Sequence, residues 1–216
     1  MELNLSMDDF KSFGRLACLS TVFVLVQFLI LTTLAAIFYP GGYNYLGYYF
    51  SDLGAITARN GAPNTISSAI FLITLTLVGI FMIPTWIILP SLFKKSTYER
   101  ITSYLGTSFG LLATPLLIGV ALFPMDTEPE LHGLFARYFF LAFGVAILIY
   151  SVAILLNEDY SNYYSIFGFV IFILVLIYVF VNLGAMHTFV QKVIVYSYII
   201  WASIQVFRIW PSVEPS

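Results

Sequence analysis

Six polar side chains near the ends of long apolar stretches are the candidates for chemistry in this sequence. They are Ser51, Asp52, Asn64, Asp126, His132 and His187. An aspartate and a histidine can act together as a general base and the group that orients it, and Ser51 is the nucleophile that stands out beside them. We therefore take Asp52, Asp126 and His132 as candidate catalytic residues, and all six side chains as candidate ligand-binding residues.

A metal site is the second chemistry that these side chains allow. His132 and His187, joined by Asp52 or Asp126, would supply the three protein ligands of a catalytic zinc ion, although no regular spacing supports this set. The sequence contains no G-x-S-x-G, H-E-x-x-H or C-x-x-C motif and no phosphate-binding glycine loop. The sequence therefore specifies no reaction, metal or cofactor, and enzymatic activity stays open.

Most of these residues also have a purely structural interpretation. A T-x-x-E pattern starting at Thr127 is typical of helix N-termini, so Asp126 is more simply explained as part of a helix start. Ser51 and Asn64 each precede an apolar stretch that they are able to cap. For His132 the two interpretations are evenly supported, because ionisable groups at membrane depth usually face a bundle interior or a hydrated cavity.

The elements that position these residues are predicted to be transmembrane helices. The chain is 60% hydrophobic and 9% charged, whereas a soluble domain has about 25% charged residues. Six apolar stretches are each long enough to cross a bilayer, at 16–38, 66–89, 101–123, 134–156, 165–183 and 190–210. We predict an all-α fold, a polytopic transmembrane bundle of six helices that forms one domain over residues 1–216. Gly106 and Gly110 predict close packing of the third helix inside this bundle.

The connection after the first span, residues 39–64, is the longest and is rich in tyrosine. Five tyrosines and a phenylalanine crowd its first half, namely Tyr39, Tyr43, Tyr45, Tyr48, Tyr49 and Phe50. Aromatic rings with a polar tip favour the headgroup layer of a membrane. We therefore predict an interfacial segment on or partly in the outer leaflet, for which an ordinary aromatic belt is a simpler explanation than a binding surface.

Composition also bounds the partners and the function. A net charge of −2, with scattered Lys and Arg, argues against nucleic acid, and membrane lipids are the expected partners. The oligomeric state is not predicted. We expect a multi-pass membrane protein with an outward-facing polar pocket for a lipid headgroup or other amphiphile. The alternatives are a membrane-embedded lipid hydrolase or acyltransferase with an Asp/His site and, more weakly, a small-solute transporter.

Two short motifs are similar to those of the domain-of-unknown-function 998 family of prokaryotic six-span proteins. They are YFSDLGA at residues 49–55, followed by Asn64, and FPMD at residues 123–126, followed by His132, Gly133 and Ala136. The likeness extends over most of the chain in the number and spacing of spans. That family is distantly similar to the FGF-receptor-activating-protein and DRAM group. The resemblance implies an architecture and a candidate pocket, and no reaction.

The distribution of positive charge predicts that both termini are cytoplasmic in a cell membrane. Six alternating spans place six Lys and Arg residues on the side of the termini and three on the other side, and the more positive side is normally inside. Tags fused to either end should resist protease added to intact cells. Digestion of either tag from outside would reverse the predicted orientation.

Overall fold

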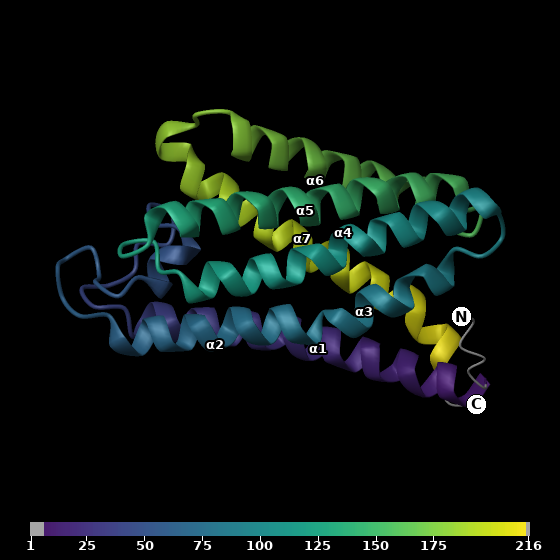
Figure 1. Cartoon of the computed structure of the whole chain (residues 1–216), viewed down its shortest axis with the longest axis horizontal. Helices are drawn as coiled ribbons and strands as arrows, with labels where there is room; N and C mark the ends of the chain where they lie inside the picture. The colour runs from purple at the N-terminus through teal and green to yellow at the C-terminus, as the bar shows by residue number, and fades with distance from the viewer. Residues whose placement is uncertain (1–6, 215–216) are drawn as a thin grey trace.

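The computed structural model describes residues 7–214, and within them the chain is helical, with no β-strand. Six helical segments are long and apolar enough to cross a membrane (Figure 1). The first span is α1 (Met7–Ile37), and the second combines α2 (Thr65–Phe81), α3 (Ile83–Ile88) and the 3-10 turn η2 (Leu89–Leu92). The others are α4 (Thr97–Leu122), α5 (Pro129–Leu156), α6 (Asn162–Phe180) and α7 (His187–Val213), which follows the turn η3 (Gly184–Met186). The predicted six-span all-α fold is confirmed.

Several helices begin before the apolar stretches that predict them. Helix α1 begins at Met7 and α4 at Thr97, because polar first turns continue a helix beyond the part that crosses the lipid. The start of α4 is fixed by Ser96, whose side-chain oxygen accepts a hydrogen bond from the backbone N–H of Glu99 at 3.1 Å. Apolar stretches thus locate the crossing segments, whereas capping residues set the helix ends.

The second span is interrupted in its middle. Helix α2 ends at Phe81 and α3 resumes at Ile83, with Pro84 in the first turn of α3. Proline has no backbone N–H to continue the ladder of the preceding helix, so a break here was expected from the sequence. Trp86 follows the break and is almost completely buried.

Helix α6 lies at the edge of the bundle, and α5 lies between α6 and α4 (Figure 1). The buried share of the most apolar stretch is 61% in α5 and 22% in α6. The start of α1 and the end of α7 lie at one end of the bundle, and the connections α1–α2, α4–α5 and α6–α7 lie at the opposite end. We call this opposite end the cap end.

A layer of aromatic rings fills the core midway along the bundle. Trp86 stacks on Trp201 at 5.9 Å and on Tyr150 at 6.2 Å, measured between ring centroids, and Tyr150 and Trp201 also contact each other at 5.9 Å. Phe143 packs edge-on against Trp86 at 5.3 Å. The three stacked rings come from α3, α5 and α7, so this layer holds helices from distant parts of the sequence together.

The two glycines of α4 face this layer, as their spacing predicts. A Cβ atom added at Gly110 would lie 2.3 Å from the ring of Trp86, and one added at Gly106 would lie 2.8 Å from the ring of Tyr150. Such distances are shorter than real carbon contacts. The close approach of α4 to its neighbours inside the bundle is therefore confirmed.

Replacement of Gly110 by leucine should destabilise the protein, because the new side chain must displace the buried indole of Trp86. Overpacking of this kind costs about 1–3 kcal/mol, so the melting temperature in detergent should fall by several degrees. Gly133→Leu is a matched control, since a Cβ added at Gly133 meets no atom within 4 Å. Equal melting temperatures for the two variants would show that α4 does not pack as described.

Candidate functional site

The connection between α1 and α2 folds over the cap end of the bundle. We call residues 38–64 the cap loop. It turns immediately after α1 through Gly41 and Gly42, whose φ angles of 80° and 86° are readily adopted only by glycine. Its single helical turn, η1 (Phe50–Gly54), has four buried residues and lies against α1, α2 and α4. The cap loop is therefore packed into the bundle and is more than a surface belt of aromatic rings.

Asp52 is buried and fully engaged within the cap loop. Its carboxylate accepts hydrogen bonds from Nε and Nη2 of Arg59 at 2.7 and 3.1 Å and from the backbone N–H of Tyr49 at 2.7 Å. The guanidinium of Arg59 also lies 4.6 Å from the ring centre of Tyr48. The hydrogen bonds to Asp52 raise the pKa of Arg59 above its usual value. Asp52, and not Ser51 as expected, caps the start of η1.

Asp126 joins the α4–α5 connection to the cap loop. Its two carboxylate oxygens accept hydrogen bonds from the backbone N–H groups of Ile56 and Thr57 at 3.0 and 2.8 Å. The first residue flanking α5 is Glu128, which makes no side-chain capping bond. The capping box predicted from Thr127 is therefore absent, because Glu128 and not Thr127 occupies the N-cap position of α5. Asp126 instead bonds to a segment 70 residues earlier in the chain.

Asn64 holds the other end of the cap loop. It occupies the N-cap position of α2, as predicted, but its side chain does not cap the helix. Instead Nδ2 donates to the carbonyl oxygens of Leu53 and Ala55 at 3.0 and 2.8 Å, and Ser67 donates to Leu53 at 3.0 Å. These bonds satisfy buried carbonyl groups of η1 and fix its distance from α2.

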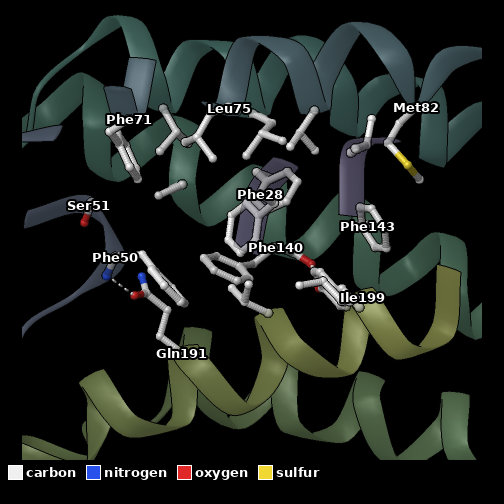
Figure 2. Close-up of a pocket in the computed structure, with 18 of the residues that line it drawn as sticks. Phe28, Phe50, Ser51, Phe71, Leu75, Met82, Phe140, Phe143, Gln191 and Ile199 are labelled. Carbon is white, nitrogen blue, oxygen red and sulfur yellow. Dashed lines mark hydrogen bonds between the residues drawn. The ribbon is translucent and has the colours of Figure 1, made fainter. Parts of the chain in front are cut away.

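Helix α7 supplies a third set of anchors. The side-chain oxygen of Gln191 accepts a hydrogen bond from the backbone N–H of Phe50 at 2.9 Å, shown as a dashed line in Figure 2. Thr188 donates to the carbonyl oxygen of Leu46 at 2.7 Å. Because these contacts join residues more than 140 positions apart, no local sequence pattern predicts them.

Lys192 is a buried cation on α7. It is one of the three Lys and Arg residues that six alternating spans place on the side opposite the termini. Its ammonium donates to the carbonyl oxygen of Tyr48 and lies 5.3 Å from the ring centres of Tyr45 and Phe50 and 5.9 Å from that of Tyr43. Among residues 7–214 no carboxylate forms a salt bridge with it. Aromatic faces and a carbonyl dipole therefore stabilise this charge. A lone lysine in an apolar stretch, together with a tyrosine-rich loop, is a signal in the sequence that could have indicated such a contact.

Below the cap loop, five helices enclose a partly open cavity of about 120 Å³. Figure 2 shows its lining, with Phe50 and Ser51 of η1 at one end and Met82 and Phe143 toward the other. Phe28 of α1 and Phe140 of α5 lie between these ends. Apolar side chains also come from α2, α4 and α7. Since Phe143 packs on Trp86, the aromatic layer lies behind the deep end of the cavity.

Only four of the lining residues carry a polar side-chain group that can form hydrogen bonds, namely Ser51, His132, Gln191 and Tyr198. Nδ1 of His132 donates to the carbonyl oxygen of Phe123 at 2.8 Å, so in the neutral ring the lone pair is on Nε2. The tyrosine hydroxyl donates to the carbonyl of Phe140 at 2.9 Å. Ser51 is 7% exposed and its hydroxyl has no hydrogen-bond partner within the described chain.

The structure thus divides the six predicted site residues into three groups. Ser51 and His132 line the cavity, without a hydrogen bond between them, whereas three residues hold the cap loop, namely Asp52, Asn64 and Asp126. His187 lies apart from the cavity, edge-on to the ring of Tyr178 with 4.4 Å between centroids. Within residues 7–214 no three His, Cys, Asp or Glu side chains are grouped closely enough to hold a metal ion.

Fold and site together define a class of protein, a six-span α-helical membrane protein with a folded cap loop above an apolar cavity. The family model described as "Protein of unknown function (DUF998)" matches residues 22–208. The chain therefore belongs to the DUF998 family, as its motifs suggested. No curated protein and no solved structure matches the chain. The prokaryotic origin and the distant similarity to the FGF-receptor-activating-protein and DRAM group stay predictions.

Loss of the charge of Asp126 should loosen the middle of the cap loop. A hydrogen bond to a charged group contributes about 1.5–3 kcal/mol. In Asp126→Asn the amide hydrogens of Ile56 and Thr57 should therefore exchange with solvent at least about tenfold faster, which corresponds to the loss of one such bond. Hydrogen exchange followed by mass spectrometry measures this rate. Glu128→Gln is the control, because Glu128 is exposed and makes no bond to the loop. Unchanged exchange in Asp126→Asn would contradict the anchoring role.

Proposed function

We propose that the protein binds a membrane-soluble amphiphile, with the apolar part of the ligand in the cavity beneath the cap loop. The protein would do so in a cell membrane, with both termini cytoplasmic and membrane lipids as the source of the ligand. The supporting observation is the cavity itself, an unfilled space of about 120 Å³ among apolar side chains of five helices. Protein interiors are normally packed without such voids, so a space of this size is suited to an apolar occupant.

The lining of the cavity is mostly apolar, whereas the sequence predicts a polar pocket. Asp52 and Asp126 use their carboxylate oxygens and Asn64 uses Nδ2 to hold the cap loop, and none of the three residues lines the cavity. They are therefore poor candidates for contact with a headgroup. Ser51 and His132, which line the cavity, are the remaining predicted residues in a position to meet a ligand.

Binding should be lost when the cavity is filled from within. Ala136 lines the cavity, and a phenylalanine in its place would occupy the space that the ligand needs. Native mass spectrometry of protein released gently from detergent should show wild-type protein with bound amphiphile and Ala136→Phe with several-fold less.

The matched control is Ala69→Phe, since Ala69 is exposed on α2 and does not line the cavity. This variant should retain as much amphiphile as the wild type, provided that its melting temperature is unchanged. Equal retention by both phenylalanine variants would reject the cavity as the binding site.

A further inference from the structure

The polar groups around the cavity also indicate which kind of headgroup it accepts. Of the side chains that line the cavity, none is aspartate, glutamate, lysine or arginine. A ligand with an ionised headgroup at this site would lose its hydration without gaining an opposite charge. Transfer of an unpaired ion into an apolar environment costs far more than transfer of a hydroxyl group.

Three charged residues at the cap end are directed at other partners. Asp52 and Arg59 pair with each other through two hydrogen bonds, so their charges largely cancel. Lys192 donates to the backbone carbonyls of Tyr48 and Thr188 and is surrounded by aromatic rings. None of these three side chains lines the cavity, and recruiting one would break bonds that hold the cap loop.

Two of the four polar lining groups are also already satisfied. Gln191 accepts from Phe50 and donates to the hydroxyl of Tyr178 at 3.1 Å. Tyr198 donates to a backbone carbonyl. The cavity thus offers a ligand the imidazole of His132 and the hydroxyl of Ser51, a buried residue whose hydroxyl has no hydrogen-bond partner within residues 7–214.

We infer that the ligand is a neutral amphiphile, an apolar chain that ends in a hydroxyl or another small uncharged polar group, bound with that group at Ser51. This inference rests on the proposed function, because it concerns the same cavity. A ligand hydroxyl both donates and accepts one hydrogen bond, which matches a serine hydroxyl. The free-energy cost of removing such a headgroup from water is largely offset when it gains a hydrogen bond in the apolar site.

The test uses three photoreactive probes of equal chain length, each with a diazirine at the same carbon. One is a fatty alcohol, one an alkyl sulfate and one an alkyltrimethylammonium ion, so that two are charged at every working pH. Each probe is added at the same mole fraction to nanodiscs that contain the purified full-length protein. After illumination, mass spectrometry locates the labelled residues. The alcohol should label cavity residues at least tenfold more than either charged probe, an order-of-magnitude expectation from the cost of an unpaired ion.

Ser51→Ala should lower labelling by the alcohol about two- to tenfold, the effect of one lost hydrogen bond. Labelling by an alkane probe of the same length should not change, because the alkane makes no hydrogen bond. A charged probe that labels the cavity as well as the alcohol would overturn the inference and leave amphiphile binding intact. The proposed function would instead be overturned if no probe labelled the cavity, or if Ala136→Phe did not reduce the labelling.

Discussion

The structure depends on one constraint, which is that backbone polar groups at the edge of a bilayer must find partners within the protein. A helix satisfies its own N–H and C=O groups, but the cap loop is largely non-helical and is packed into the bundle. Side chains from α2, from the α4–α5 connection, from α7 and from the loop itself provide those partners. Asp126 accepts from two amides, Asn64 donates to two carbonyls, and Gln191 and Lys192 reach the loop from α7. The buried polar side chains Asp52, Asn64, Gln191 and Lys192 therefore all hold the loop.

This use of polar groups explains why the space below the loop is apolar. Of the side chains that anchor the loop, Gln191 lines the cavity and Asp52, Asn64, Asp126 and Lys192 do not, so most of the lining is left to apolar side chains such as Phe28, Leu75 and Ile199 (Figure 2). The bound part of a ligand would therefore meet hydrocarbon over most of its length. At the deep end, Phe143 and the aromatic layer around Trp86 separate the cavity from the end where the chain termini lie. This arrangement favours binding from one side over passage through the bundle.

Sequence reasoning identified the fold and the important residues better than their roles. Apolar stretches predict six spans because lipid imposes length and hydrophobicity on each helix separately. The candidates Asp52, Asn64 and Asp126 were singled out as polar residues at membrane edges, and each is engaged in the bonds that hold the cap loop. Their partners could not be predicted, because these partners are backbone atoms whose positions depend on the whole fold. Lys192 was overlooked for the same reason, since its rings and carbonyl lie in the cap loop.

The anchoring of the cap loop also constrains how the protein is made. The loop leaves the ribosome soon after the first span, whereas Asp126 follows 70 residues after Ile56, and Gln191 follows 141 residues after Phe50. During synthesis the loop therefore lacks its partners on α7 until the last helix has been made. Until then its tyrosines can hold the loop in the headgroup layer of the membrane, which such rings favour. The cap loop, which is synthesised early, is accordingly among the last parts of the protein to complete its contacts. A chain that stops before α7 would lack the hydrogen bonds that α7 makes to this loop.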